Sequence, residues 1–372
     1  MANTTLTPTA VTREALRILH QKLNFVGTVN REYDSSFGKS GAKIGDSLKI
    51  RLPNVYTVRS GAALSSQDVV ESSVTLQVST QKGVDTTWTS DDLSLDIDDF
   101  GPRILEPAMS VLAANIESDA MAMYKDVYNH VTDVGATIEA SDVMKASKVL
   151  TDNLAPYDNR CLNLSTQDNL DLVDALKGLY NDQTNVGKNY KEGRVASNTF
   201  GYQSIMENSL WPQHTTGTDD GTGDYLVNDS GTIAEGSTSI TTDTGAGTYL
   251  IGDIFYFASV YAVHPETKAT LTKLKEFTVT ANSGTSATTI SFSPAMYSSG
   301  AKQNVSAMPA NNAALHKNES DQSTDIAASA DFGVSMAYHK DAFCFATADL
   351  VMPKGVDFAA REVMDGISMR IV

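Results

Sequence analysis

The stretch FGPRILEPAMSVLAANIESDAMAMYKDVYNHV, residues 100–131, decides the fold because it carries the longest regular pattern in the chain. Its apolar side chains recur at steps of three and four residues, the spacing of one face of an α-helix. They are Leu105, Met109, Leu112, Ile116, Ala120, Met123, Val127 and Val131. Pro102 and Pro107 suit the first turn, and Asp98 and Asp99 suit its positive end. The pattern predicts one spine helix over about 103–131, roughly 40 Å long.

Before the spine the sequence predicts a short helix and a β-hairpin. Residues 10–27 place Val11, Ala15, Ile18, Leu19 and Leu23 at helical spacing. From residue 45 the period changes to two, in SLKIRL (47–52) and SVTLQVST (73–80), which is typical of strands. A two-stranded hairpin is not stable alone in water. We therefore expect it to lie on the rest of the chain or on another chain.

After the spine the sequence predicts an α+β body interrupted by an inserted β-domain. Helices capped by Ser141 and Ser165 flank a strand at RCLNLS (160–165). Residues 216–312 are rich in Gly, Ser and Thr and contain strand-like runs, which favours a small separate domain. The runs are IFYFASVYAV (254–263), KEFTVTA (275–281) and ATTISFS (287–293). Alternation in the style of the body returns in DFGVSMAYH (331–339) and AFCFATADLVMP (342–353).

The charge is negative overall and uneven along the chain. The 372 residues contain 28 Lys and Arg against 45 Asp and Glu, a net charge of −17. Residues 1–60 carry nine basic and four acidic side chains, a net charge of +5, so the remaining 312 residues carry −22. The total disfavours a free nucleic-acid-binding or anionic-membrane protein. The basic start predicts an arm that meets an anionic partner, although a solvated helix followed by ordinary strands accounts for the charge equally well.

The sequence pattern predicts neither a secretory signal nor a membrane span. The start MANTTLTPTAVTREAL lacks the cationic start and apolar core of a secretory signal. No apolar stretch approaches the roughly 18 residues of a membrane span. We expect a water-soluble protein with no membrane partner.

No motif predicts an enzyme, a metal site or a cofactor. Cys161 and Cys344 have no CxxC spacing, and the six histidines form no HxH or HxxxH pair. GKS at 38–40 lacks the glycine that a P-loop needs five positions earlier. The aspartate-rich runs DDLSLDIDD (91–99) and DDGTGD (219–224) fail the spacing of calcium loops. We expect no catalytic residues, no metal and no cofactor.

The order of elements resembles the major capsid (coat) proteins of tailed bacteriophages, in particular the coat family of short-tailed phages that carries an inserted β-domain. The resemblance covers nearly the whole chain. It is carried by NREYDSSF…KIGDSLKIRLP (30–53), DDLSLDIDDFGPRILEPAMSVLAANIESDA (91–120), GRVASNTFGYQSIMENSLWP (193–212), GDIFYFASVYAVHPETK (252–268), QNVSAMPA (303–310) and HKDAFCFATADLVMPKGVDFAAREVMDGISMRIV (339–372).

The resemblance implies the tailed-phage capsid fold, with peripheral and axial domains, an N-terminal arm, an extended hairpin loop and an inserted domain of β-barrel type. It divides the chain into an arm (1–44), an extended loop (45–92), the first part of the peripheral and axial domains (93–215), the insertion (216–312) and the return (313–372). Family members continue with further strand sequence, so we also expect a continuation past Val372.

The function implied by the resemblance is structural. Copies would assemble as hexamers and pentamers into an icosahedral shell, in the host cytoplasm, and become the virion capsid around double-stranded DNA bound without sequence specificity. A scaffolding protein, a portal protein and a decoration protein are the further partners implied, and procapsid maturation is expected as DNA enters.

Two groups of contact residues follow from the resemblance. Scaffold or inter-subunit contact through the arm would fall on Arg13, Glu14 and Arg17. An arm that contacts only other coat subunits would have the same sequence features. Inter-subunit contact through the loop would fall on Arg51, Arg59 and Lys82. Some tailed-phage capsids crosslink a loop lysine to an asparagine, but Lys82 is the only lysine in 61–100 and no acidic catalytic partner is evident for it, so we predict no covalent crosslink.

Two other classes remain open at this point, with an enzyme as a remote third. A nanocompartment shell of the same fold would enclose cargo proteins, although such shells lack a large insertion. Residues 216–312 could instead be an adhesin or carbohydrate-binding module, with aromatic side chains that stack on sugars. Those aromatics are Tyr249, Phe255, Tyr256, Phe257 and Tyr261. Alternating aromatics in strands are more often core, which favours the first interpretation.

Overall fold

The computed structural model describes residues 8–31, 47–59, 61–64, 66, 71–85, 101–131, 137–176, 198–219, 225–229, 233–317, 328–348, 355, 359–364 and 367–372. Backbone contacts divide the chain into two compact units. The first comprises residues 1–54, 68–120 and 340–372, and the second comprises 55–67 and 121–339. The elements mix helices and strands, which confirms the predicted α+β class.

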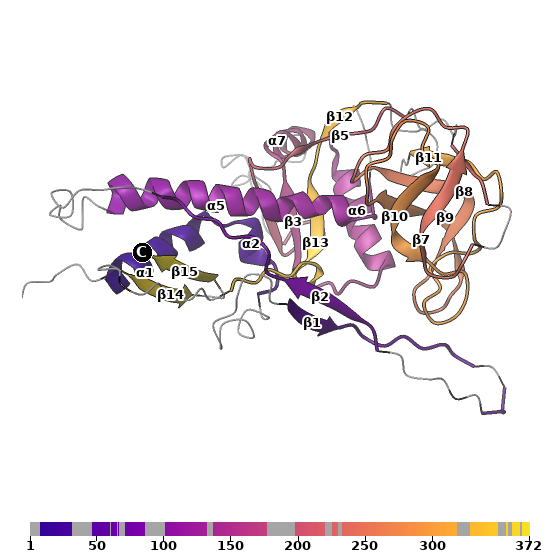
Figure 1. The fold of residues 1–372 in the computed structure, drawn as a ribbon, viewed down its shortest axis with the longest axis horizontal. Coiled ribbons are helices and arrows are strands. Elements are labelled where there is room, and N and C mark those ends of the chain that lie inside the picture. The colour runs from indigo at the N-terminus through magenta and orange to yellow at the C-terminus, as the bar shows by residue number, and fades with distance from the viewer. Residues whose placement is uncertain are drawn as a thin grey trace, which may run out of the picture. The chain divides into compact units, whose positions relative to one another are not determined.

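In the first unit the N-terminal helix is packed down rather than free. Helix α1 (Pro8–Lys22) contacts the hairpin of β14 (Ala360–Met364) and β15 (Ile367–Ile371), as Figure 1 shows. Its inward face is buried and mostly apolar: Val11, Ala15, Leu16, Ile18 and Leu19 are each at most 8% exposed, with Thr12 at 0% among them. The chain then breaks and forms one further turn, α2 (Phe25–Thr28). The helix predicted at 10–27 is therefore confirmed, with an interruption near its end.

The spine helix is present but shorter than predicted. A π-helical turn η2 (Gly101–Leu105) leads into α5 (Glu106–Met121), which tightens into a 3₁₀ turn η3 (Ala122–Asp126). Val127 is already extended, at φ −91° and ψ 116°. The prediction of helix to residue 131 is wrong at this end because residues after the helix bond across to β9 (Thr270–Val279): the His130 backbone N–H donates to Glu276 Oε2 at 3.2 Å.

The hairpin forms as the alternating sequence predicts. Strands β1 (Ser47–Arg51) and β2 (Ser73–Gln77) pair antiparallel, with Leu48 opposite Leu76 and Ile50 opposite Val74. Directly opposed residues share a face of the pair. One face of the hairpin is consequently apolar and the other polar.

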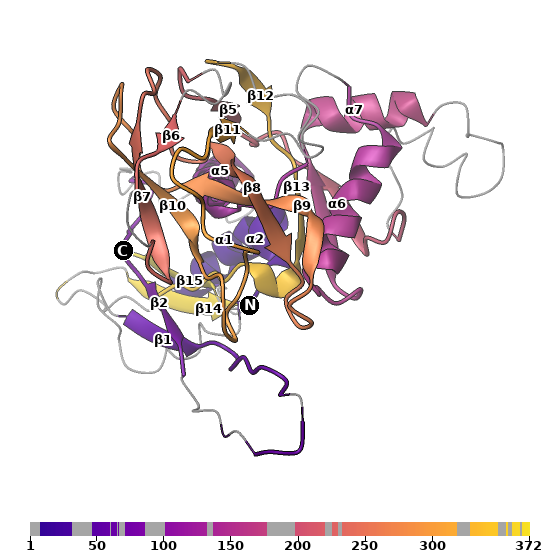
Figure 2. The ribbon, with the colours of Figure 1, turned by 90° about the vertical axis from the view of Figure 1, so that its right-hand side faces the viewer.

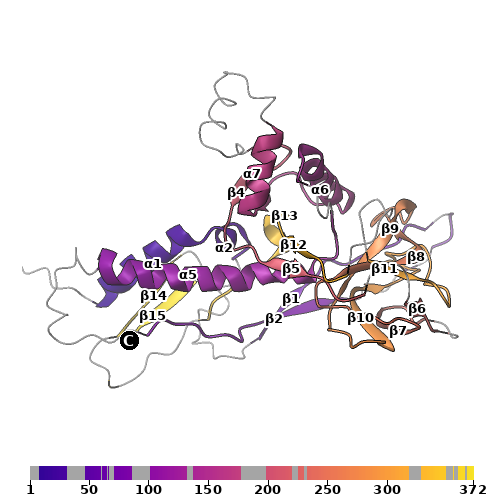
Figure 3. The same cartoon turned by 90° about the horizontal axis from the view of Figure 1, so that it is seen from above.

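A three-stranded sheet with two helices forms one part of the second unit. Its order is β13 (Met336–His339), β3 (Arg160–Leu164), β4 (Ser204–Glu207). Helices α6 (Ala140–Asp152) and α7 (Thr166–Ala175) lie beside it in Figure 3. The Ser165 cap is confirmed, since its hydroxyl accepts the Asp168 N–H at 3.1 Å. The Ser141 cap is wrong: Glu139 caps α6, in a capping box with Asp142.

The insertion is a six-stranded sheet that closes on itself (Figures 1 and 2). Its strands are β6 (Leu226–Val227), β7 (Ser237–Asp243), β8 (Ile254–Val263), β9 (Thr270–Val279), β10 (Thr289–Met296) and β11 (Leu315–Lys317). They follow the order β11-β8-β9-β10-β7-β6. Two backbone bonds of 2.9 Å join its ends, from Leu315 N–H to Tyr225 O and from Val227 N–H to Ala313 O. The result is a small β-barrel.

The barrel interior is aromatic, as predicted for strand aromatics. Tyr249, Phe255 and Phe257 are 0% exposed, and Phe277 and Phe292 join them in edge-to-face contacts. Tyr256 is 6% exposed, whereas Tyr261 is 38% exposed. Four of the five aromatic residues considered for sugar stacking are thus buried within the domain.

A short stem connects the barrel to the body. Strand β5 (Gln213–Thr215) pairs antiparallel with β12 (Asp331–Gly333), and Thr216 N–H donates to Ala330 O at 3.0 Å. The barrel strands extend to Lys317, five residues beyond the boundary expected at 312. In the run 342–353, residues 343–348 form no strand of their own, because the chain turns at η5 (Lys340–Ala342).

Candidate assembly surfaces

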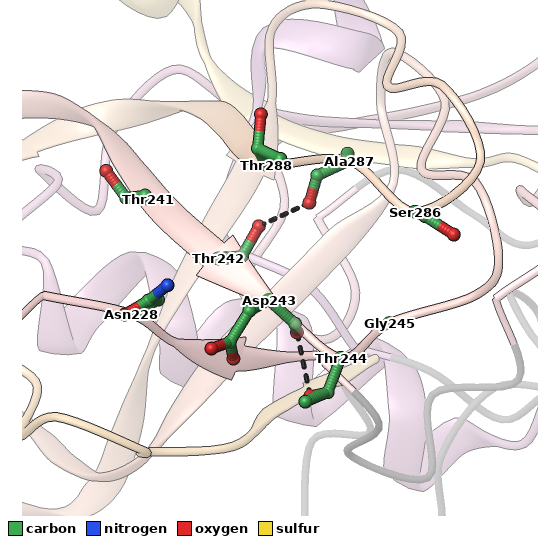
Figure 4. A pocket seen from close by; sticks show the side chains of 9 residues that line it. All are labelled: Asn228, Thr241, Thr242, Asp243, Thr244, Gly245, Ser286, Ala287 and Thr288. Atoms are coloured by element: carbon green, nitrogen blue, oxygen red, sulfur yellow. Dashed lines mark hydrogen bonds between the residues drawn. The ribbon is translucent and has the colours of Figure 1, made fainter.

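Among the described residues no constellation suited to catalysis or metal binding stands out. No group of three or more His, Cys, Asp or Glu side chains there could hold a metal ion. GKS (38–40), DDLSLDIDD (91–99) and most of DDGTGD (219–224) lie outside the described residues. A polar pocket of about 300 Å³ lies beside the end of β7 (Figure 4). Asn228, Thr241, Thr242, Asp243, Thr244, Gly245, Ser286, Ala287 and Thr288 line it, so its one ionisable group is the Asp243 carboxylate.

The structure brings the three predicted arm residues together on the outer face of α1. Arg17 Nε donates to Glu14 Oε2 at 3.0 Å. This hydrogen bond lowers the pKa of Glu14 and raises that of Arg17. Arg13, whose side chain is 71% exposed, lies 3.3 Å from Glu362 of β14. The trio forms an exposed, charged strip that is anchored at one end to the C-terminal hairpin.

The three predicted loop residues do not form a single site. Arg51 pairs with Glu71 across the hairpin at 3.1 Å. Arg59 instead donates to the carbonyl of Ala63 at 2.8 Å and to that of Gly61, which stabilises a local turn. Both arginine side chains lie at the surface.

Lys82 has a different environment from the one expected. Its ammonium contacts Asn115 Oδ1 and the Asp119 carboxylate, both on α5 of the same chain. Lys82 therefore has an acidic neighbour, Asp119, which its position in the sequence does not reveal. The Asp119 side chain is 59% exposed, so water solvates this carboxylate. Such a setting favours an ordinary surface ion pair.

The hairpin carries apolar side chains that its own chain leaves uncovered. Val58 is 95% exposed, Leu64 is 88% exposed and Tyr56 is 57% exposed. Leu52, Val55, Val74 and Val84 are also exposed. Scattered exposed apolar residues need no explanation, but a concentration on one element marks an interaction surface.

A buried carboxylate that sequence reasoning missed fixes the arm to the spine. Glu117 of α5 is 1% exposed and accepts the backbone N–H groups of Phe25 and Val26, each at 3.0 Å. These N–H groups lie at the start of α2, where a negative charge is stabilising. The sequence signal for the burial of Glu117 is helical periodicity, because Glu117 lies four residues after the buried Ala113.

A second missed group lies at the end of the spine helix. Tyr124 Oη and His214 Nδ1 are 2.9 Å apart, and His214 Nε2 lies 2.9 Å from Asp253 Oδ1. Asp253 also accepts the N–H groups of Gly217 and Leu250. Burial, followed by the charge of Asp253, raises the pKa of Tyr124 to about 12. These contacts join Tyr124 of η3, His214 of β5 and Asp253 at the start of β8. The group therefore fixes η3 to the base of the barrel.

Comparison with known proteins decides the family. The sequence model described as P22 coat protein, gene protein 5, matches residues 9–354, nearly the whole chain. The chain belongs to the P22 coat protein family. The resemblance seen in the sequence is confirmed, and with it the tailed-phage capsid character of the α+β fold and of the inserted barrel.

Three of the solved structures that match the chain are described next. A structure titled Mycobacterium phage Che8 is 15% identical, with a TM-score of 0.39 over 52% of this chain and 79% of its own. The CUS-3 coat protein I-domain is 29% identical, with a TM-score of 0.18 over 27% and 92%. The capsid of cyanophage P-SCSP1u is 12% identical, with a TM-score of 0.33 over 58% and 73%. No curated protein matches the chain.

Membership in the P22 coat protein family establishes a structural role in a bacteriophage virion capsid. The family consists of coat proteins and is not an enzyme family. Within the described residues, no helix is long and apolar enough to cross a membrane.

Proposed function

We propose that copies of this chain assemble as hexamers and pentamers into an icosahedral shell that encloses the double-stranded DNA of a tailed phage. The observation that carries this proposal is the set of exposed apolar side chains along the β1–β2 hairpin and the segment that joins its strands: Val58 is 95% exposed, Leu64 is 88% exposed and Val74 is 53% exposed. A two-stranded hairpin gains stability only when another surface covers it. Heterologous contacts of this kind, closed by symmetry, build shells from many copies.

The charged strip on α1 supports a contact with a scaffolding protein. Arg13, Glu14 and Arg17 project from a helix whose other face is buried, so they are held in a fixed arrangement. Charged strips of this type guide partner encounter and set orientation more than they add affinity. A portal protein and a decoration protein complete the partners that family membership suggests.

The charge of the chain supports enclosure of DNA without tight binding. Its net charge is −17, whereas proteins that grip DNA neutralise phosphates with basic side chains. An acidic shell lets packaged DNA slide past its wall. Sequence-specific recognition is not required for this role.

Negative-stain electron microscopy of the chain produced together with the products of its neighbouring genes tests the proposal. Closed shells several hundred ångströms across, filled with DNA in infected cells, are the expected result. Only monomers in the presence of a scaffold candidate would contradict the shell. Closed shells that hold protein cargo and no DNA would instead favour a nanocompartment.

A further inference from the structure

The turn between α6 and β3, residues 153–159, presents two apolar side chains to solvent. Leu154 is 44% exposed and Tyr157 is 71% exposed. Leu154 adopts φ +63°, a left-handed conformation that favours glycine at the end of a helix. Ala155 N–H donates to Leu150 O at 2.9 Å, which closes the helix in the usual way for this geometry. A strained, exposed leucine at a glycine position indicates that its side chain serves a purpose outside the fold.

The turn is rigid because the buried side chain of Arg160 forms hydrogen bonds to its carbonyl groups. Arg160 is 0% exposed, and its guanidinium donates to the carbonyls of Ala155 at 2.6 Å and Pro156 at 2.7 Å. It also donates to Thr151 Oγ1 at 3.1 Å, and its Cζ lies 4.3 Å from the centre of the Tyr157 ring. The exposed ring therefore keeps one orientation. Preorganised aromatic side chains of this kind serve as anchors of protein interfaces.

The charges around the turn point to a basic partner. Asp152 and Asp158 flank the two apolar side chains and are exposed, whereas the charge of Arg160 is buried beneath them. Lys148, one turn earlier on α6, is the nearest cation along the helix. The surface that the turn presents is thus apolar at its centre and predominantly acidic at its edge.

The first limb of the hairpin, residues 47–59, has the complementary character. It contains Lys49, Arg51 and Arg59 and no acidic residue, with Arg51 paired to Glu71 of the other limb. Its exposed apolar side chains include Val55 and Val58. Apolar contact with a matching rim of opposite charge is the arrangement that gives interfaces their specificity.

We propose that the turn 153–159 of one copy receives the first hairpin limb, residues 47–59, of a neighbouring copy. The inference rests on the proposed shell, in which the hairpin contacts a neighbour, and it names the surface that the hairpin contacts. Leu154 and Tyr157 supply the apolar anchors. Asp152 and Asp158 face the basic side chains of the arriving limb.

Substitution of Leu154 by glycine separates this role from a role in folding. Leu154→Gly relieves the left-handed backbone, so the monomer should resist unfolding at least as well as the unmodified chain. Assembly should nevertheless require about tenfold more protein, the change expected when one anchor is lost. Asn159→Gly, at φ +54° in the same turn, is the matched control and should assemble normally. Assembly of Leu154→Gly at the unmodified concentration would overturn the proposal.

Disulfide trapping tests the pairing of the two surfaces directly. Particles of the double variant Tyr157→Cys, Val55→Cys should give multimers on a non-reducing gel, while each single variant should not. A charge exchange provides the second readout: Asp158→Lys should slow assembly, and adding Lys49→Glu should restore it. Particles that form without disulfide multimers and without rescue would refute this surface alone, whereas a chain that forms no particles in any version would refute the proposed shell.

Discussion

At the scale of single residues, Arg160 shows how one buried cation fixes the end of a helix and the start of a strand. Its guanidinium donates to the carbonyls of Ala155 and Pro156, which follow the end of α6. Arg160→Ala should lower the free energy of unfolding by about 2–4 kcal/mol, because several charge-assisted hydrogen bonds are lost together. Urea unfolding measures the change, with exposed Lys148→Ala as a control expected to shift it by less than about 0.5 kcal/mol. Equal effects of the two substitutions would contradict this account.

Gly245 is a residue whose missing side chain makes room for the barrel core. A Cβ atom there would lie 2.2 Å from ring carbons of Tyr225, which is 0% exposed. Gly245→Ala should therefore cost about 1–3 kcal/mol of stability or more, as overpacking does. Gly284→Ala is the matched control, since no atom lies within 4 Å of its added Cβ. Thermal unfolding that is unchanged in both variants would show that the Tyr225 ring moves aside freely.

Lys275 gives the barrel a dependence on alkaline pH. Its ammonium lies 4.3 Å from the centre of the Tyr128 ring, with Lys273 and Glu276 beside it. Burial, with a smaller contribution from Lys273, lowers the pKa of Lys275 to about 8, against the opposing effect of Glu276. Between pH 8 and the ordinary lysine pKa the native state binds fewer protons than the unfolded state, so this group adds stability as pH rises.

The Lys275→Met variant isolates that contribution. The quantity to measure is the difference in unfolding free energy, the value of the unmodified chain minus that of the variant. This difference should rise from pH 8 to pH 9.5, with a slope of up to about 1.4 kcal/mol per pH unit. Tyrosines that also titrate in this range cancel in the difference. A difference that stays flat or falls would mean that Lys275 is solvated in the folded protein.

At the scale of elements, the two faces of the β1–β2 hairpin allow a comparison between adjacent residues. Val74 lies on the apolar face opposite Ile50, and Thr75 lies on the polar face opposite Lys49. Val74→Asp should abolish shell formation, because an unpaired carboxylate would be buried against the neighbouring copy. Thr75→Asn leaves the charge of the polar face unchanged and should assemble normally. Sedimentation of the products distinguishes shells from monomers, and normal shell formation by Val74→Asp would contradict docking of the apolar face.

Local signals predicted the elements, and distant contacts set their limits. The three- and four-residue steps predicted α5, and Ser165 was identified as a cap because its partner is three residues away. The end of the spine helix was missed because Glu276, about 150 residues later, holds the backbone of His130.

The same distinction holds for the candidate sites. The grouping of Glu14 with Arg17 follows from helical spacing, so sequence was sufficient for the arm strip. The contacts of Glu117 with Phe25 and of His214 with Tyr124 join residues about 90 positions apart. Only the packing of separate elements creates such contacts, so no local sequence pattern predicts them.

At the scale of the whole molecule, the environment of Lys82 bears on whether copies become covalently joined. Its neighbours Asn115 and Asp119 belong to the same chain, and Asp119 is exposed. We expect no amide bond from Lys82 to Asn115 or to another copy, because a carboxylate exposed to water is poorly placed to assist the loss of ammonia from an amide. Particles boiled in denaturant should run as intact monomers, with the same mass as the chain before assembly. A ladder, or a mass reduced by one ammonia, would contradict this.

The stem of the barrel has a consequence for the history of the chain. Thr216 and Ala330 are bonded neighbours, and Ser329 N–H donates to Gly217 O, so more than a hundred residues depart and return at one point. To the rest of the protein this excursion is equivalent to the tip of a tight β-hairpin. A single recombination event could therefore have introduced the barrel into an ancestral coat gene without rearranging any strand of the recipient. Lineages could exchange such a cassette while the shell-forming part of the gene evolved at its own rate.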